Sequence, residues 1–233
     1  MQEQMLLTAL GAFSGALLSL LLSIFIEYQR KPKLVFEIEE PPTDRTYESH
    51  PARNARFVRV LLHNRPMPKL FRWLGRAAAM QCNGEIQFHH ANDGVPIFAK
   101  PMMIRWAKSD EPFSFQALQE GKVKPVFDPS KYNASFRRDC YPGDKEQIDV
   151  AARFDNDTEC YGWSNETYLP DKGWRNQDWK LPAGRYLVTI KVHSSGETVR
   201  GTFKLENIAS RENFRLLPAT EDDINKTKIS SKG

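Results

Sequence analysis

Two short clusters contain residue types that bind metal ions. His89 and His90 precede Asp93, and imidazole and carboxylate groups are common zinc ligands. Neighbouring residues of a strand point to opposite faces, however, so the two histidines cannot easily bind one ion. No Cys-x-x-Cys or His-x-x-x-His pattern accompanies them. We therefore predict no metal ion and no cofactor at this cluster.

The second cluster is acidic. Asp155, Asp157 and Glu159 have the alternating spacing of a calcium-binding loop. The glycine and the later glutamate of an EF-hand are missing, so a solvated acidic turn is the main interpretation and calcium binding stays open.

Residues typical of catalysis do not form a recognisable motif. The sequence has no glycine-rich phosphate loop and no Gly-x-Ser-x-Gly motif, and its cysteines have no evident activating neighbours. An enzyme would need a site assembled from distant residues. The candidates for such a site are His63, His89, Asp93, Asp155 and Glu166. The sequence therefore favours binding over catalysis.

A segment at 155–180 is rich in aromatic residues and contains three of the five tryptophans. Flat rings interleaved with hydrogen-bonding groups can form a binding surface for a protein, a peptide or a sugar. Alternatively, the loop folds back and packs its own rings against one end of the domain. Both interpretations stay open. The predicted binding residues are Tyr161, Trp163, Tyr168, Trp174, Arg175 and Trp179.

A basic strip lies in a stretch without acidic residues, between Glu48 and Glu85. Its cations are Arg65, Lys69, Arg72 and Arg76, and they alternate with apolar and aromatic residues. This mixture suits an anionic membrane surface. The plainer interpretation is that the apolar residues face the core while the cations are solvated. A nucleic-acid partner is not predicted, because stacking platforms and groove-fitting elements are missing.

The chain has one strongly apolar run near its N-terminus. It extends from Met5 to Ile26 and contains 22 residues and no charge. About 20 apolar residues cross a ~30 Å hydrocarbon core as a helix. Tyr28 follows at the depth of an interfacial aromatic residue. We predict a single transmembrane helix; a cleaved signal peptide would begin with a basic region, which MQEQ lacks.

Positive charges near the helix ends predict its orientation. Arg30, Lys31 and Lys33 follow the helix and no cation precedes it, which places the large domain in the cytoplasm. Three cysteines, too few for a disulfide framework, suit that compartment. The opposite, extracytoplasmic topology is supported by four N-x-S/T sequons, at Asn133, Asn156, Asn165 and Asn225.

Small residues recur every four positions in the helix, at Gly11, Gly15 and Ser19. Such a face lets two helices approach closely, so a homodimer through the helix is a hypothesis. The alternative is that small residues are simply common in membrane helices.

After the helix, apolar and polar residues alternate with a period of two, which is typical of strands. Predicted strands cover 34–39, 56–62, 84–90, 147–154, 185–192 and 198–207. Turn signals separate them and no long amphipathic helix follows residue 30. The pattern predicts a mainly β protein with an antiparallel β-sandwich.

The predicted organisation of the 233 residues has four parts. They are the transmembrane helix and N-terminus at 1–28, a juxtamembrane segment with the first strand at 29–55, the sandwich at 56–217, and a disordered tail at 218–233. The net charge of +4 and the mean hydropathy of −0.56 describe an ordinary soluble chain only because the polar domain outweighs one apolar span.

Val58–Asn64 and Ala78–Ile86 form a strand ending in asparagine and a following Ala-x-x-Cys strand. Together with the Pro142-Gly143-Asp144 turn, they resemble bacterial immunoglobulin-like domains of the cell-adhesion-related type. The resemblance covers about half of the part after the helix and carries over no functional residues. It implies adhesion, scaffolding or recognition.

We therefore expect a single-pass membrane-anchored binding or scaffold protein without catalytic activity, with the lipid bilayer and an unidentified protein as partners. The alternatives are an extracytoplasmic domain for adhesion or glycan recognition and a membrane-bound enzyme.

Overall fold

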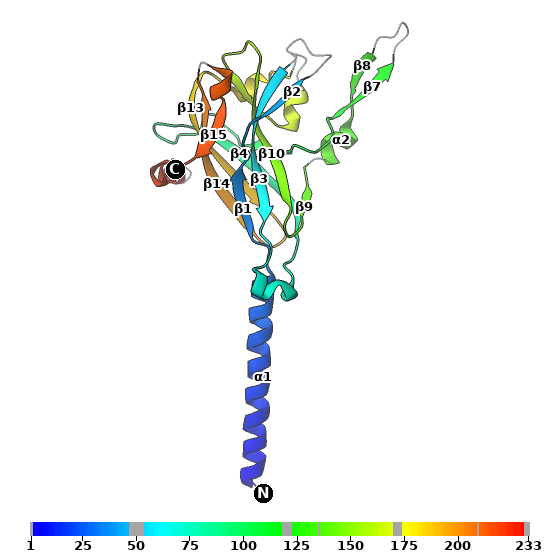
Figure 1. Cartoon of the computed structure of the whole chain (residues 1–233), viewed down its shortest axis with the longest axis vertical. Coiled ribbons are helices and arrows are strands. Elements are labelled where there is room, and N and C mark those ends of the chain that lie inside the picture. The colour runs from blue at the N-terminus through cyan, green and yellow to red at the C-terminus, as the bar shows by residue number, and fades with distance from the viewer. Residues whose placement is uncertain are drawn as a thin grey trace.

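The computed structural model describes residues 2–46, 54–117, 123–134, 136–169, 174–208 and 210–230. Parts of the predicted juxtamembrane segment (47–53), aromatic segment (170–173) and tail (231–233) lie outside the described residues. The protein is mainly β, with antiparallel sheets that follow one N-terminal apolar helix. Figure 1 shows this helix projecting from one end of the sheet domain.

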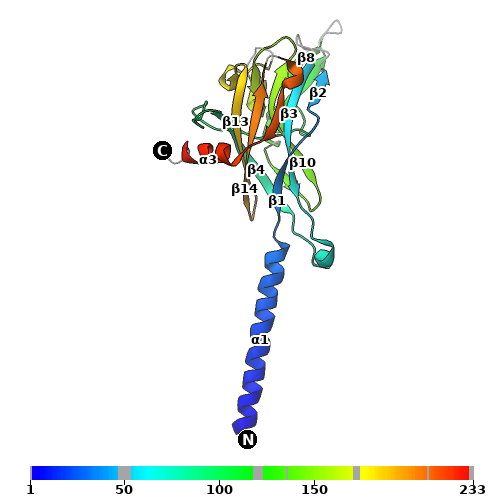
Figure 2. The ribbon, with the colours of Figure 1, turned by 60° about the vertical axis from the view of Figure 1, so that its left-hand side comes forward.

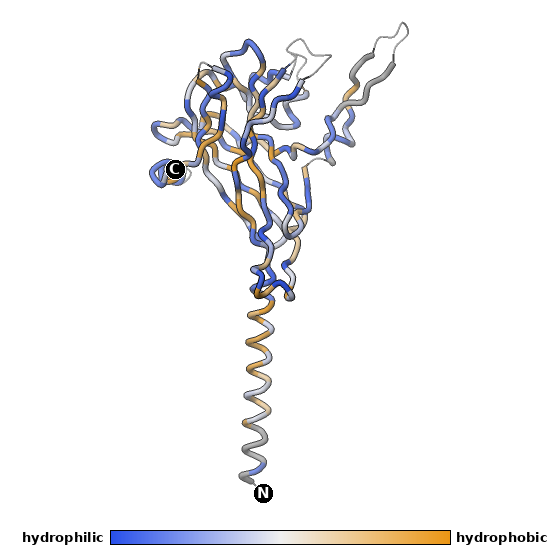
Figure 3. The backbone as a smooth tube through the Cα atoms, viewed as in Figure 1, coloured by the Kyte–Doolittle hydropathy of each residue, from blue (hydrophilic) through white to orange (hydrophobic). Residues whose placement is uncertain are grey.

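The N-terminal helix α1 (Gln2–Arg30) is about 44 Å long at 1.5 Å per residue. None of the residues Leu10–Arg30 is buried inside the protein, and Figure 3 shows apolar residues along this part of the helix. Among the described residues it is the one helix long and apolar enough to cross a membrane. A signal sequence passes the same test of length and composition, whereas a buried core helix is inconsistent with this exposure.

The first sheet has the strand order β1-β3-β10-β11-β12, with β2 paired to β3 and β6 paired to β10. Its strands are β1 (Leu34–Ile38), β2 (Thr43–Thr46), β3 (Asn54–Asn64), β6 (Arg105–Trp106), β10 (Lys145–Phe154), β11 (Cys160–Gly162) and β12 (Lys180–Leu181). A bulge at residue 150 shifts the register between the pairs Arg59–Asp149 and Val58–Ala151. Arg59 and Asp149 are paired directly before this shift, so their side chains lie on the same face of the sheet.

The second sheet has the order β15-β14-β13-β4-β5, and β9 pairs with β4. Its strands are β4 (Ala79–His90), β5 (Met102–Met103), β9 (Arg138–Cys140), β13 (Gly184–His193), β14 (Thr198–Asn207) and β15 (Arg215–Pro218). A separate hairpin of β7 (Phe113–Ala117) and β8 (Val123–Phe127) extends away from the two sheets in Figure 1. Short helices fill the connections: η1 (Lys69–Leu74), α2 (Pro129–Ala134), η3 (Asn165–Tyr168), η4 (Gln177–Trp179) and η5 (Arg211–Asn213).

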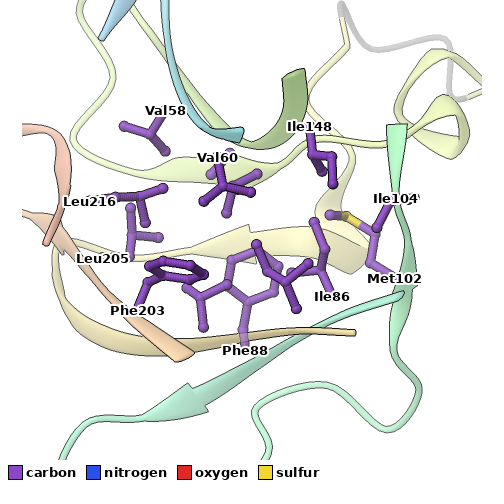
Figure 4. Close-up of a cluster of buried hydrophobic side chains, with 14 of the residues drawn as sticks. Val58, Val60, Ile86, Phe88, Met102, Ile104, Ile148, Phe203, Leu205 and Leu216 are labelled. Carbon is purple, nitrogen blue, oxygen red and sulfur yellow. The ribbon is translucent and has the colours of Figure 1, made fainter. Parts of the chain in front are cut away.

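The two sheets share one hydrophobic core. Figure 4 shows Val60 and Ile148 of the first sheet facing Ile86, Phe88 and other residues of the second. Each of these side chains is fully buried. Burying an aliphatic or aromatic side chain of this size stabilises the folded state by about 1.5–3 kcal/mol. The alternation read from the sequence therefore identifies the facing sides of both sheets.

The six predicted strands are confirmed: they correspond to β1, β3, β4, β10, β13 and β14. The hairpin at 113–127 and the short edge strands were not predicted. Outside the hairpin, the unpredicted strands have two to four residues, too few for a clear alternation of polar and apolar side chains.

The prediction of a disordered tail is wrong for Glu221–Ser230, which form helix α3. Thr220 and Asp223 form reciprocal hydrogen bonds at its start, with Asp223 Oδ2 accepting from Thr220 N (2.8 Å) and Thr220 Oγ1 accepting from Asp223 N (3.4 Å). Asp223 also pairs with Lys204 of β14 at 2.7 Å. The capping pair Thr220–Asp223 was the available sequence signal for this helix.

Candidate membrane-proximal site

The end of α1 is joined to the domain through Asn64, the last residue of β3, which is fully buried. Its Oδ1 accepts a hydrogen bond from the backbone N–H of Lys33 at 3.1 Å. Its Nδ2 donates to the carbonyl oxygens of Ala77 (3.1 Å) and Cys140 (3.0 Å). One buried amide therefore connects the chain leaving α1, the start of β4 and the end of β9. Loss of this amide would leave three backbone groups without these partners, which is costly where water cannot replace them.

Both ends of the segment 65–76 are also fixed to the end of α1. Arg65 N donates to Lys33 O at 2.9 Å, and Arg76 Nη1 donates to Lys31 O at 2.6 Å. At the far end of the segment, Ala77 N donates to Arg30 O at 2.7 Å. The last carbonyls of a helix lack partners within the helix, so this contact satisfies one of them. The segment 65–76, the basic loop, thus begins and ends beside the helix terminus.

The apolar residues of the basic loop are exposed. Leu70 and Trp73 in η1 are each 78% exposed, and no residue of η1 is buried. Met67 is buried and holds the loop to the domain. The helical turn ends at Gly75, whose φ of +64° favours glycine. The interpretation in which the apolar residues of this loop face the core is therefore wrong for Leu70 and Trp73.

The exposed cations of the basic loop have no acidic neighbours in the part of the chain that the structure describes. Arg65, Lys69 and Arg72 are exposed, and no carboxylate in the described part of the chain lies within ion-pair distance of them. Figures 1 and 2 both place η1 at the level where α1 meets the domain. The predicted basic strip is thus a positively charged, partly apolar projection beside the helix end.

Four of the predicted aromatic binding residues lie in the interior instead. Tyr161, Trp163, Tyr168 and Trp179 are at most 4% exposed. The binding interpretation is therefore wrong for these rings, and the packing alternative describes them. Tyr161, Trp163 and Tyr168 form a second hydrophobic cluster with apolar residues on the outer face of the first sheet, whereas Trp179 lies in the core that the two sheets share.

This second cluster joins the loop to the outer face of β3 and β10. Trp163 packs edge-on against Phe57 at 5.0 Å between ring centroids and contacts Phe154 at 6.0 Å. Trp174 is half-buried, 5.7 Å from Tyr168, and Arg175 lies over the Phe154 ring at 4.5 Å. Of the predicted set, Trp174 and Arg175 alone keep appreciable exposed surface.

A buried charge cluster beneath this loop was not predicted. Arg59 Nε donates to Asp149 Oδ1 at 2.6 Å, and both side chains are at most 4% exposed. The Nε of Arg105 lies 3.7 Å from the other carboxylate oxygen. Arg105 Nη1 also donates to Asn165 Oδ1 at 2.6 Å, which ties the aromatic loop to β6. Charged residues in a strand normally indicate a face exposed to solvent. The cluster could therefore be recognised only from knowing which residues of neighbouring strands lie opposite each other.

Each carboxylate of the predicted acidic cluster is paired with a cation. Asp155 contacts Arg211 at 2.7 Å, Asp157 contacts Arg175 at 2.6 Å, and Glu159 contacts Lys180 at 2.7 Å. The contact with Lys180 lowers the pKa of Glu159 to about 2. Among the described residues, no group of three or more His, Cys, Asp or Glu side chains could hold a metal ion.

The candidate residues for an enzyme make separate local contacts. His63 contacts Glu37 at 3.1 Å, and Asp155 accepts a hydrogen bond from Asn54 at 2.6 Å. Glu166 accepts a hydrogen bond from Trp179 Nε1 at 3.3 Å. His89 is buried, where it contacts Gly94 O through Nδ1 at 2.9 Å, and burial lowers its pKa. Asp93 caps the following turn by accepting from Val95 N at 3.0 Å. The structure does not bring these five side chains into one site.

The predicted dimer face has no partner among the described residues of the chain. A Cβ added at Gly11 or Gly15 would meet no atom within 4 Å, and Ser19 Oγ donates to Gly15 O at 2.9 Å. Space for a second helix is therefore present along this face, and the homodimer stays a prediction.

Comparisons with family models, curated proteins and solved structures give no match.

Proposed function

We propose that the chain is a single-pass membrane protein whose sheet domain is held at the membrane surface and acts by binding. The exposed apolar helix α1 carries this proposal, because the described part of the domain buries none of the residues Leu10–Arg30. The hydrogen bonds from Lys33 to Asn64 and from Ala77 to Arg30 support retention of the helix. They place the backbone that follows α1 within the fold, and a chain cleaved after Arg30 would lose the contact from Ala77 to Arg30.

We infer that the domain is of the immunoglobulin-like type. In chain order, β1, β3, β4, β6, β10, β13 and β14 take the places of strands A to G. The first sheet then has the order A-B-E-D and the second contains C-F-G, as in immunoglobulin domains. This order supports a role in recognition or scaffolding, because such folds present loops and strand faces to partners.

We further propose that the domain faces the cytoplasm. Arg30, Lys31 and Lys33 support this orientation, and the basic loop adds cations at the same level. Cys82, Cys140 and Cys160 are free thiols, which suits a reducing compartment. The alternative is an extracytoplasmic domain for adhesion or glycan recognition. The second alternative, a membrane-bound enzyme, is less well supported because its candidate residues lie apart.

The test of anchoring and topology uses the full chain. Alkaline carbonate washing should leave the full-length protein in the membrane fraction, and a C-terminal alkaline phosphatase fusion should be inactive. Release into the wash, or a shortened chain that lacks α1, would contradict anchoring. An active phosphatase fusion would contradict the cytoplasmic orientation alone.

The homodimer is tested by Gly15→Ile in a membrane two-hybrid assay. We expect the bulky side chain to weaken self-association, because it occupies the space available for a second helix. Leu17→Ile, on the opposite face of α1, is the matched control and should have no effect. Unchanged association of the Gly15 variant would remove this hypothesis.

The unidentified protein partner is sought by affinity purification in mild detergent. Trp174→Ala is the informative variant, because Trp174 is the tryptophan of the aromatic segment that keeps exposed surface. Partners lost only in this variant would locate the binding face. An unchanged set of partners would count against the aromatic segment as that face.

A further inference from the structure

At the end of a membrane-type helix, the basic loop exposes a tryptophan and a leucine beside cations that form no ion pair with any described residue. Trp73 and Leu70 are each 78% exposed, although Met67 in the same loop is buried. Solvent-exposed apolar groups clustered with cations mark interaction surfaces. Tryptophan is enriched where a protein meets the interface between lipid and water, because its ring is amphipathic.

We propose that the basic loop docks on anionic phospholipid headgroups of the same bilayer that α1 crosses. In this arrangement Trp73 and Leu70 enter the interfacial region, while Arg65, Lys69 and Arg72 contact lipid phosphates. The inference rests on the proposed membrane anchoring, and it adds the lipid class and the residues that recognise it.

The depth of the loop agrees with this assignment. Ile26 ends the apolar run, and Arg30 follows four residues later, which is about 6 Å along a helix. The headgroup region on each side of a bilayer is about 5–8 Å thick. Because Ala77 and Arg76 bond to the carbonyls of Arg30 and Lys31, the end of the loop is fixed at headgroup depth.

The charge of the loop selects anionic lipid over other occupants. The segment 65–76 contains four cations and no acidic residue. Each cation of a protein that lies near an anionic leaflet raises the equilibrium constant for binding to that leaflet about fivefold. Because α1 and Asn64 hold the loop beside the membrane, docking is an intramolecular step with a high effective concentration of lipid. Contact through α1 and the loop together would limit tilting of the domain.

The test measures quenching of tryptophan fluorescence by brominated lipids, using the full chain reconstituted in vesicles. Phosphatidylcholine vesicles are compared with vesicles that also contain phosphatidylglycerol. Trp106, Trp163 and Trp179 are buried inside the domain. Trp174 is half-buried in the aromatic segment, which Figure 1 shows at the end of the domain away from α1. Quenching should therefore come from Trp73, so Trp73→Phe should abolish it and Trp174→Phe should preserve it.

Charge variants test the headgroup contact. In anionic vesicles, Arg72→Gln should lower the equilibrium constant for docking about fivefold. The double variant Lys69→Gln with Arg72→Gln should lower it about 25-fold. The matched control is Arg185→Gln, which removes an exposed cation from the far end of β13 and should change nothing.

Flotation and carbonate washing of the same vesicles separate the two proposals. Inserted protein with anion-dependent quenching of Trp73 supports docking. Inserted protein whose Trp73 is not quenched, or is quenched equally without anionic lipid, overturns docking but leaves anchoring intact. Protein that does not insert overturns anchoring itself, and the docking proposal with it.

Discussion

The side-chain oxygen of Asn64 accepts a hydrogen bond from the backbone N–H of Lys33 at 3.1 Å, so the end of β3 holds the chain that leaves α1. The backbone of Asn64 also bonds to the turn before β10, accepting from Gly143 N at 2.8 Å and donating to Asp144 O at 3.3 Å. An amide suits this position because it accepts on one side and donates on the other. This side chain therefore couples the helix to the domain, together with the hydrogen bonds that Arg65, Arg76 and Ala77 donate to the end of α1.

Asn64→Ala should lower the free energy of unfolding of the domain by about 2–3 kcal/mol. The substitution leaves Lys33 N–H and the carbonyls of Ala77 and Cys140 without these partners in a buried place. Thermal or urea unfolding of the detergent-purified full chain, followed by tryptophan fluorescence, measures the change. Asn83→Ala is the matched control, because Asn83 makes an exposed local hydrogen bond to Gln81 O. A loss at Asn64 no larger than the loss at Asn83 would contradict the coupling.

The sequence alone predicted the elements whose side chains alternate regularly. In β13, Val188, Ile190 and Val192 are fully buried in the common core, as their spacing indicated, although Leu187 and Thr189 on the other face are buried too. Helix α1 was equally predictable, since an uncharged apolar run needs no tertiary information. Local sequence patterns therefore predict a helix or strand when its burial depends on only one of its faces.

The exposure of Trp73 and the burial of Trp163 could not be read from the sequence. Both tryptophans lie in segments that mix aromatic or apolar residues with polar ones, and composition gives both the same two interpretations. Their difference depends on tertiary partners. Phe57 and Phe154 offer Trp163 an apolar surface to cover, whereas η1 projects from the domain beside α1. The buried Arg59–Asp149 pair was missed for the same reason, because its partners are 90 residues apart.

Asp149→Asn should destabilise the domain by about 3–5 kcal/mol. The variant removes the charge that Arg59 and Arg105 share in a buried cluster, and an uncompensated buried cation is costly. Urea unfolding of the full chain in detergent measures the loss. Glu85→Gln is the control, because the Glu85–Lys191 pair is exposed and 3.9 Å apart, and it should change stability by less than about 1 kcal/mol. Equal effects of the two variants would show that the buried cluster contributes no more than a surface pair.

Acid should weaken the attachment of α3 through Asp223. Burial opposes ionisation of this carboxyl, but hydrogen bonds from Lys204 and Thr220 outweigh it and lower the pKa to about 2. The pKa in the unfolded chain is near 3.8, so the contribution is fully present above about pH 5 and is lost as the pH falls toward 2. Asp223→Asn should lower stability at pH 7 by about 1 kcal/mol and flatten the pH dependence between 5 and 2. Asp222→Asn, on the exposed side of the same turn, should leave that slope unchanged.

The three cysteines should be unreactive in the folded protein at pH 8. Burial raises the pKa of Cys82 to about 12 and that of Cys140 to about 11, and it raises the pKa of Cys160 as well. The thiolate is the reactive form, so a thiol that stays protonated and inaccessible reacts slowly. Absorbance measured with a thiol-disulfide reagent should show no rapid reaction of the native full chain and three thiols after denaturation. Ser195→Cys, in the exposed turn between β13 and β14, should add one fast-reacting thiol and verify that the reagent has access. Rapid reaction of any native cysteine at pH 8 would show that its strand opens to solvent, contrary to the close packing of the core.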